Sequence, residues 1–278
     1  MVAFSELVVS QARVACAAVG NFEWKRRPGQ KGPRILCLDG GGTRGVISIA
    51  ILKELLARLG IDKRPFELFD MICGTSTGGI ITALLGVQRM DINDVDTFYF
   101  SLIESIFSRG STTSLINKLA KYADNEDFWE HLLENISDNE LLIDSNRYNV
   151  PKVFMVCSNF SVSPTKSVIF TNYNYPPTSI EPSAYFRVNT RTAVRATSAA
   201  PPYFRYVTLG NHIIGDGALT NNNPTGEAFK EARVISCFYS ISHTVLVELC
   251  IALYVETFRR GARVDSFYWN RSVQDKPE

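Results

Sequence analysis

The sequence has no excess of charge, few histidines and no paired cysteines. Its 278 residues hold 29 lysines and arginines against 28 aspartates and glutamates, a formal net charge of +1. This balance gives no reason to expect nucleic acid as a partner. None of the six cysteines stands in a C-x-x-C pair, so reduced thiols in an intracellular protein are expected rather than a disulfide framework.

The sequence leads us to expect neither a metal site nor a secretory signal. No cluster of His, Asp and Glu has the spacing of a metal site, so we expect no metal and no cofactor. The first residues include an apolar patch, but Glu6 interrupts it and no basic segment precedes it. A signal peptide normally has an uninterrupted apolar segment after a basic one, so none is expected here.

One long apolar run lies near the C-terminus, at residues 234–258, and is long enough to cross a bilayer. His243 and Glu248 lie within this run, and Glu256 lies near its end. Ionisable groups at the depth of a bilayer are costly. A membrane-spanning helix at 234–258 is therefore not favoured.

Short and long apolar segments alternate through the middle of the chain. Residues 1–33 are predicted to form a helix and a Pro/Gly linker, and residues 234–278 form an apolar tail. Between them, at 34–233, alternating strands and helices predict an α/β domain whose mostly parallel sheet is flanked by helices. Strands are predicted at 34–38, 69–73, 153–157, 167–170, 203–209 and 212–214, and helices at 46–59, 79–87, 191–199 and 225–233.

The motif Gly74-Thr75-Ser76-Thr77-Gly78 has the G-x-S-x-G pattern and lies between a predicted strand and a predicted helix. A tight turn in this position presents a serine at the edge of the sheet, above a helix N-terminus that favours negative charge. The same letters can also form a simple turn without chemistry. The strand–turn–helix context favours Ser76 as a nucleophile.

A second glycine-rich turn, Gly40-x-Gly42-x-x-Gly45, follows the strand predicted at 34–38. A dinucleotide-binding loop would require the next strand to end in an acidic residue, but that strand ends in the turn carrying Ser76. A P-loop would require a Gly-Lys-Ser/Thr sequence, which is absent. A loop whose N–H groups stabilise an oxyanion fits better.

A nucleophilic serine needs a base, and the chain has three histidines, His131, His212 and His243. Only His243 has the chain order of an ordinary hydrolase triad, and its surroundings show no loop signature. Asp216, in Gly215-Asp216-Gly217-Ala218, is the better candidate because a carboxylate at a tight turn can take the serine proton directly. Taken alone, the Asp-Gly pair is more typical of a hairpin turn.

Three segments in this order, Asp39–Gly45, Gly74–Gly78 and Asp216–Ala218, resemble the motif set of the patatin-like phospholipase family. The segments Arg195–Pro201 and Asn221–Pro224 resemble further parts of that family. The resemblance covers about residues 30–232 and is greatest to the calcium-independent phospholipase A2 gamma branch.

The resemblance implies a patatin-like variant of the α/β-hydrolase architecture with a Ser76–Asp216 dyad. It implies an oxyanion hole at Gly41, Gly42 and Thr43, and a calcium-independent enzyme of lipid catabolism that cleaves fatty-acyl esters of glycerophospholipids. The substrate would be met at a membrane surface, to which the protein is expected to bind peripherally. Arg44 could contact a lipid phosphate, although an arginine in a first helical turn is as often directed to solvent.

The likeness ends after Arg233, where family members continue with a further strand and a Gly-rich turn. We therefore divide the chain into residues 1–33, a patatin-like phospholipase domain at 34–233, and a divergent apolar tail at 234–278. The altered tail leaves open a catalytically impaired relative that binds lipid or a partner. Nothing in the sequence indicates an oligomeric state.

Overall fold

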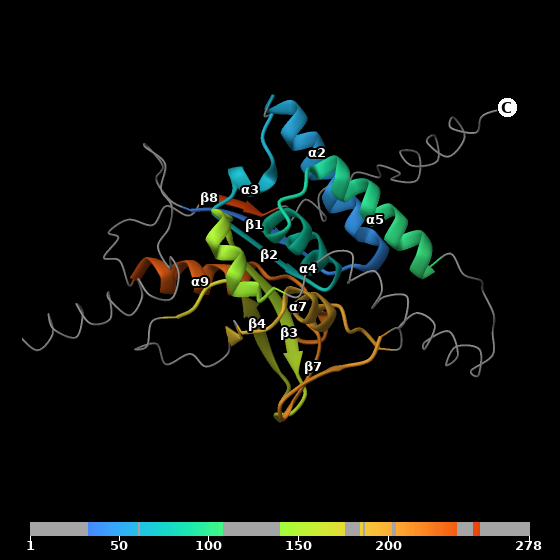
Figure 1. Ribbon diagram of the computed structural model, residues 1–278, viewed down its shortest axis with the longest axis vertical. Coiled ribbons are helices and arrows are strands. Elements are labelled where there is room, and N and C mark those ends of the chain that lie inside the picture. The colour runs from blue at the N-terminus through green and yellow to red at the C-terminus, as the bar shows by residue number, and fades with distance from the viewer. Residues whose placement is uncertain are drawn as a thin grey trace, which may run out of the picture.

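The computed structural model describes residues 33–60, 62–107, 140–175, 184–185, 187–201, 204–237 and 247–250 (Figure 1). The helix and linker predicted at 1–33 lie almost entirely outside this part of the chain, as do His131 and His243. The rest of the predicted pattern, from the strand at 34–38 to the helix at 225–233, can be compared with the structure.

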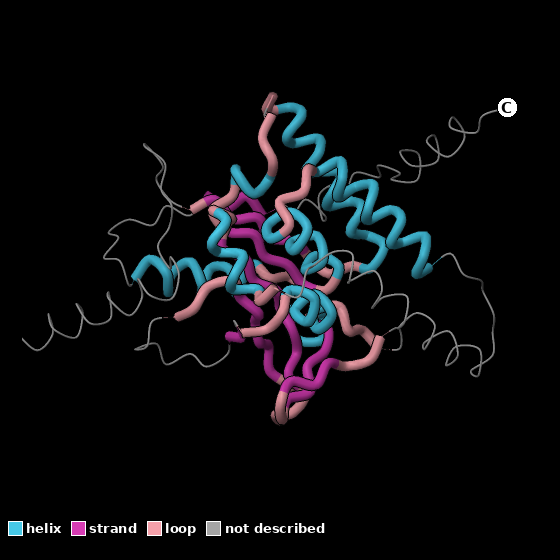
Figure 2. The backbone as a smooth tube through the Cα atoms, in the orientation of Figure 1, coloured by secondary structure: helices cyan, strands magenta, loops and turns pink. Residues whose placement is uncertain are grey.

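Strands and helices alternate as the sequence predicts (Figure 2). The strands are β1 (Arg34–Leu38), β2 (Met71–Thr75), β3 (Lys152–Asn159), β4 (Lys166–Thr171), β5 (Ala184–Tyr185), β6 (Val207–Leu209), β7 (His212–Asp216) and β8 (Val247–Cys250). The helices are η1 (Gly42–Arg44), α2 (Gly45–Arg58), α3 (Pro65–Leu68), α4 (Thr77–Thr82), η2 (Ala83–Val87), α5 (Ile92–Phe107), η3 (Leu142–Tyr148), α7 (Thr190–Thr197), α8 (Ala218–Asn221) and α9 (Thr225–Cys237).

The second strand is displaced from the 69–73 predicted for it and runs from Met71 to Thr75. Phe69 instead ends α3, donating its N–H to the Pro65 carbonyl at 3.2 Å. The Asp70 carboxylate accepts the backbone N–H of Arg34 at 2.7 Å, which fixes the level at which β1 and β2 begin. The displacement carries β2 up to the residue before Ser76.

The sheet is mixed and mostly parallel, with the strand order β5-β4-β3-β2-β1-β8. Parallel ladders join β1 to β2, β1 to β8, β2 to β3 and β4 to β5. The strand β3 pairs antiparallel with β4, and β7 pairs antiparallel with both β3 and β6. The predicted fold class, a mostly parallel sheet flanked by helices, is confirmed.

One edge of β3 is shared by two strands. The first half of β3 pairs with β2, ending at the pair Thr75–Val156, and the second half pairs with β7, beginning at the pair Asp216–Cys157. Because β2 is parallel to β3 and β7 is antiparallel to it, the two strands run toward each other along this edge. Their C-terminal ends therefore meet.

Apolar side chains alternate between the two faces of the sheet, as expected for strands buried on both sides. Leu36 and Ile72 belong to the larger core cluster, which includes residues of α2, α4, α5 and α7. Ile35 and Met71 belong to a second cluster with Ala228 and other residues of α9. Figure 1 shows α2 and α5 side by side, and it shows α9 apart from both of them.

The region after Arg233 takes part in the fold. Helix α9 continues through Cys237, and Val247–Cys250 adds a parallel strand to the outer edge of β1. Within the described residues, no helix is long and apolar enough to cross a membrane. The division of the chain at residue 233 stays a prediction.

A buried hydrogen bond fastens α9 to the sheet. The Tyr173 hydroxyl, just after β4, donates to Oε2 of Glu231 on α9 at 2.8 Å, and both side chains are buried. Burial and the nearby Glu231 carboxylate raise the pKa of Tyr173 well above its ordinary value, so this hydroxyl keeps its proton. The Lys152 ammonium lies 5.3 Å from the centre of the Tyr173 ring.

We expect Tyr173→Phe to destabilise the fold, because it removes the donor and leaves a buried carboxylate with one partner fewer. The expected loss is about 1–3 kcal/mol in the free energy of unfolding, measured by urea denaturation. Lys230→Ala is the control, since it removes only an exposed contact of 3.0 Å to Glu227 on the same helix, and pairs of this kind contribute about 0.5 kcal/mol or less. Equal stabilities for Tyr173→Phe and wild type would contradict the role given to this bond.

Candidate active site

Ser76 stands at the turn between β2 and α4 in a backbone conformation that few residues other than glycine adopt. Its φ is 56° and its ψ is −123°, and such positions are strained for a residue with a Cβ. A strained serine between a strand and a helix is the geometry of a nucleophile elbow. The turn predicted from the G-x-S-x-G pattern is therefore present.

The glycines on either side of Ser76 are required by close packing. A Cβ on Gly74 would collide with the backbone of Gly78, and a Cβ on Gly78 would collide with the Leu38 carbonyl. The elbow can therefore press against the end of β1 only if both positions lack a side chain. The spacing of glycines in the motif follows from these contacts.

The structure brings Asp216 directly to Ser76, as the meeting of β7 and β2 requires. The Ser76 hydroxyl donates to Oδ2 of Asp216 at 2.6 Å, which is the length of a hydrogen bond to an ionised oxygen. The other carboxylate oxygen, Oδ1, accepts the Ala218 N–H at 2.8 Å. Asp216 is thus held by the tight turn that follows it.

Asp216 lies in a dry environment, with 1% of its surface exposed. Burial raises the pKa of its carboxyl group above the ordinary value, and the hydrogen bonds from Ser76 and from the Ala218 N–H partly offset that rise. A carboxylate with a raised pKa is a stronger proton acceptor than a solvated one. The arrangement can therefore withdraw the proton of the Ser76 hydroxyl.

Thr197 joins the two halves of the site, and no feature of the sequence indicated this role. Its hydroxyl accepts the Ser76 N–H at 3.0 Å and donates to the Val156 carbonyl at 2.5 Å. Its own carbonyl accepts the N–H of Gly217, next to Asp216, at 3.3 Å. The segment Arg195–Pro201 was noticed for its resemblance, but a hydrogen bond between a helix end and a distant elbow leaves no local pattern.

The glycine-rich loop lies against the elbow. The Gly41 N–H donates to the Thr77 hydroxyl at 3.1 Å, and Gly40 exchanges two hydrogen bonds with Asn222, at 3.2 and 3.1 Å. A Cβ on Gly40 would lie 3.1 Å from the Ser76 Cβ and would collide with the side-chain amide of Asn222. The structure therefore brings the predicted oxyanion loop and the predicted nucleophile together.

Two N–H groups of this loop stand at a helix start. Gly42 and Thr43 open the short helix η1, where N–H groups have no carbonyl within the helix to bond. Among the described residues no acceptor is found for either group. Gly42 has a φ of +58°, a conformation that glycine adopts readily, and the hydroxyl of buried Tyr99 anchors its carbonyl at 2.7 Å.

Arg44 ends η1 and is exposed to solvent. Its side-chain Nε donates to the Gly41 carbonyl at 3.2 Å, which ties the guanidinium to the glycine loop. The residue is thus at the rim of the candidate oxyanion loop. Its contact with a phosphate stays a prediction.

Among the described residues, no histidine is placed to serve Ser76. His212 begins β7, with Nδ1 at 3.3 Å from the side-chain amide of Asn159. Asp216 lies four positions farther along the extended strand, at a distance of about 13 Å. The triad containing His243 lies outside the described residues.

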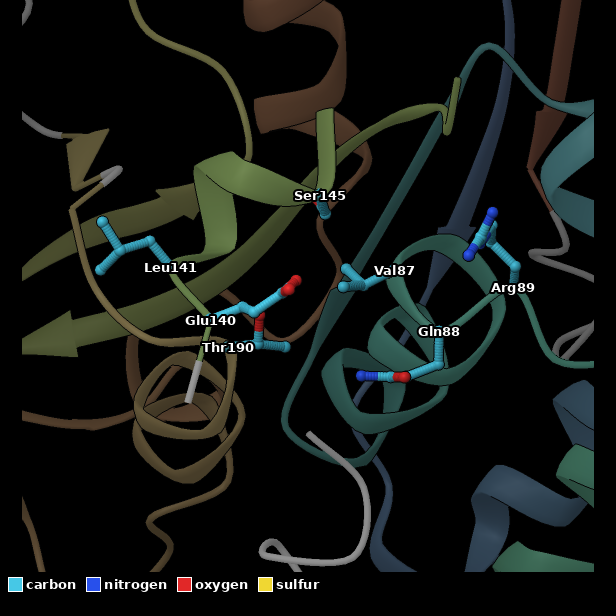
Figure 3. Close-up of a pocket in the computed structure, with 7 residues that line it drawn as sticks. All are labelled: Val87, Gln88, Arg89, Glu140, Leu141, Ser145 and Thr190. Atoms are coloured by element: carbon cyan, nitrogen blue, oxygen red, sulfur yellow. The ribbon is translucent and has the colours of Figure 1, made fainter. Parts of the chain in front are cut away.

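A pocket of about 220 Å³ lies away from the serine (Figure 3). It is lined by Val87 and Gln88 at the far end of the helix that starts after Ser76, and by Thr190 at the opposite end of α7 from Thr197. Two helices therefore connect this pocket to the candidate site. Within the described part of the chain, no group of three His, Cys, Asp or Glu side chains is placed to hold a metal ion.

Comparisons with known proteins agree with the geometry. Phospholipase A I of Arabidopsis thaliana is 32% identical over 277 aligned residues, covering 78% of this chain and 21% of that protein. Human Calcium-independent phospholipase A2-gamma is 33% identical over 211 residues, covering 74% of this chain and 26% of that protein. The chain thus spans about a quarter of the length of each of these two relatives.

A solved structure, human GIVD cytosolic phospholipase A2, matches 82% of this chain and 44% of that chain, with a TM-score of 0.42 and 13% identity. That likeness is too distant for residues to be equated. The family model described as Patatin-like phospholipase matches residues 36–229, which include the glycine-rich loop, the elbow and the Asp216 turn. This chain belongs to the patatin-like phospholipase family.

Proposed function

We propose that this chain hydrolyses fatty-acyl esters of glycerophospholipids, with Ser76 as the nucleophile and Asp216 as its base. The observation that carries the proposal is the 2.6 Å hydrogen bond from the Ser76 hydroxyl to Asp216 on a strained elbow. The family supports an acyl hydrolase, and the relatives, which are phospholipases, support phospholipid as the substrate class.

The first half-reaction forms an acyl-enzyme. As Oγ of Ser76 attacks the ester carbonyl carbon, its proton passes to the Asp216 carboxylate. The tetrahedral intermediate collapses, the bond to the glycerol oxygen breaks, and Asp216 returns the proton to that oxygen. A lysophospholipid leaves, and the fatty acyl group remains on Ser76.

The second half-reaction releases the acyl group by the same route. Asp216 takes a proton from water, whose oxygen attacks the acyl carbon, and the proton then returns to Ser76 as the acyl bond breaks. The products are a fatty acid and the free serine. One carboxylate thus serves as base and then acid in each half, so no histidine is required.

We propose that backbone N–H groups of the glycine-rich loop beside the elbow stabilise the oxyanion of the tetrahedral intermediate. The N–H groups of Gly42 and Thr43 are the available donors, and the loss of one such donor typically costs about 3–4 kcal/mol of transition-state stabilisation. The Gly41 N–H donates to the Thr77 hydroxyl in this structure. It becomes a third donor to the oxyanion when the Thr77 side chain rotates out of that hydrogen bond. In this proposal Arg44, which is exposed beside the loop, contacts the phosphate of the lipid headgroup.

Calcium independence and peripheral attachment to an intracellular membrane belong to the same proposal. Calcium independence is part of the name of the relative Calcium-independent phospholipase A2-gamma, and peripheral attachment follows from a substrate that resides in bilayers. The divergent region after Arg233 suggests the alternative function. In that alternative the chain is a catalytically impaired member of the family that binds lipid or a partner. The experiments below separate the two.

Ser76→Ala and Asp216→Asn are each expected to lower kcat roughly 10³-fold or more, because a nucleophile and its base act as a unit. The measurement is fatty-acid release from defined phospholipids, with and without a calcium chelator, and the chelator should not change the rate. His212→Ala is the control and should retain activity. A folded wild-type chain without turnover would support the impaired relative, and inactivity of His212→Ala alone would overturn the dyad.

The pH profile tests the base. Because Asp216 must be ionised to accept a proton and burial raises its pKa, activity should fall as pH drops through a value above about 3.9, the ordinary pKa of an aspartate. The midpoint of the acid limb of kcat/KM measures this value. Asp39, whose pKa burial also raises, is the competing group, so an acid limb that moves in Asp39→Asn would contradict the assignment to Asp216.

Thr197→Val tests the residue that joins the two halves of the site. The valine keeps the shape but neither accepts the Ser76 N–H nor donates to Val156, so we expect kcat to fall roughly 10–100-fold through misplacement of the nucleophile. Thr197→Ser keeps the hydroxyl and should recover most of the activity. Thermal unfolding of both variants separates misplacement from unfolding, and a fully active Thr197→Val would show that the hydroxyl is dispensable.

A further inference from the structure

Exposed apolar side chains gather at the end of the molecule where β3, β4 and β7 converge. Val162, Tyr206 and Ile213 expose 38%, 45% and 45% of their surface. They belong to two segments, the turn between β3 and β4 and the hairpin of β6 and β7. Figure 1 shows these two segments projecting together, away from α2 and α5. We call this surface the apolar tip and define it by Phe160, Val162, Tyr206 and Ile213.

The two segments of the apolar tip form one connected surface. The Phe160 N–H donates to the Ile213 carbonyl at 2.9 Å, and the Ile213 N–H donates to the Ser161 hydroxyl at 2.7 Å. The rings of Phe160 and Tyr206 lie 4.8 Å apart. Both rings cover Gly215, where a Cβ would lie 2.6–2.7 Å from them. The tip is therefore fixed to the strand that ends in Asp216.

The charge of the two segments is of one sign. Residues 159–166 and 204–213 contain no aspartate or glutamate, whereas Lys166 and Arg205 are exposed within them. The whole chain, by contrast, is nearly neutral at +1. Apolar and aromatic side chains beside basic ones are suited to the surface of a bilayer with anionic headgroups, which attracts each lysine or arginine near it.

The apolar tip is close to the candidate site. Ile213 precedes Asp216 by three residues on the same strand, which places them about 10 Å apart along it. Apolar faces of peripheral proteins enter the boundary between headgroups and acyl chains by about 5–10 Å. A tip embedded to that depth holds Ser76 and Asp216 next to the layer in which phospholipid esters lie.

We propose that the apolar tip docks this chain on the surface of an anionic phospholipid bilayer. The inference rests on the proposed function, because it identifies the surface through which the same site meets its substrate. It also specifies which lipids favour docking, since a negatively charged surface attracts Lys166 and Arg205.

The test compares two pairs of substitutions on exposed apolar residues. Val162→Ser/Ile213→Ser removes apolar surface from the tip without touching Phe160 or Tyr206, whose rings pack beside Asp216. Leu59→Ser/Phe100→Ser is the matched control, since these residues are 59% and 44% exposed. Leu59 follows the last residue of α2 and Phe100 is on α5, and both helices lie at a distance from the tip. Both pairs are made in wild type and in Ser76→Ala, which binds without consuming lipid.

Flotation with vesicles measures docking. With phosphatidylcholine vesicles containing phosphatidylserine, the tip variant should bind at least roughly tenfold more weakly than wild type, and the control should bind as wild type does. Vesicles of phosphatidylcholine alone should bind wild type weakly. Hydrolysis of a soluble short-chain ester should be equal in wild type, tip variant and control, whereas hydrolysis of vesicle lipid should fall only in the tip variant.

Two outcomes would overturn the docking proposal, and a third would count only against the proposed function. Equal flotation of the tip variant and wild type would exclude the tip as the docking surface. A tip variant that changes from dimer to monomer in sedimentation while still binding vesicles would make the tip an interface between proteins. Failure of wild type on the soluble ester would count against the proposed function alone, since flotation of Ser76→Ala measures docking independently.

Discussion

The arrangement of the whole site depends on one constraint, the sharing of a single edge of β3 by two strands that run toward each other. Thr75 pairs with Val156 and Asp216 pairs with Cys157, so consecutive residues of β3 hold the ends of β2 and β7. Backbone hydrogen bonds in a ladder fix this register to one residue. The contact between Ser76 and Asp216 follows from the ladder and needs no long loop to position it.

The packing around these strand ends explains why small residues are concentrated there. Gly78 and Gly217 each approach a strand carbonyl so closely that a Cβ would collide with it, and Gly40 lies against Ser76 itself. Thr197 then bonds to both the elbow and the turn after Asp216. The strained serine and the buried carboxylate each cost stability, and the dense contacts around them offset that cost. Rigidity of this kind is what a preorganised catalytic site requires.

Much of this could be predicted from the sequence, because short apolar runs and glycine turns are local signals. The strand before Gly40, the turn at Ser76 and the helix after Gly45 all appear where periodicity places them. The encounter of Ser76 with Asp216 could not be derived from those signals. An Asp-Gly turn after a strand has no marker for the antiparallel direction of β7. The need for a base made Asp216 a candidate, and the resemblance to a family strengthened its connection to Ser76.

Non-local contacts account for what the sequence did not indicate. The hydrogen bond from the Ser76 N–H to the Thr197 hydroxyl links residues 121 positions apart, and the hydrogen bond from the Gly41 N–H to the Thr77 hydroxyl joins one turn to the next. The beginning of β2 at Met71 depends on the hydrogen bond from the Arg34 N–H to Asp70, again between separate elements. Such contacts are decided by packing, and the local pattern of residue types does not encode them.

The proposed mechanism requires Ser76 to be the activated nucleophile of this chain. A fluorophosphonate reacts covalently with serines made nucleophilic by a neighbouring base, and peptide mass spectrometry identifies the residue modified. We expect a single adduct, on Ser76, and we expect no adduct on folded Asp216→Asn protein. An adduct on another residue, or a well-folded chain that remains unlabelled, would contradict it.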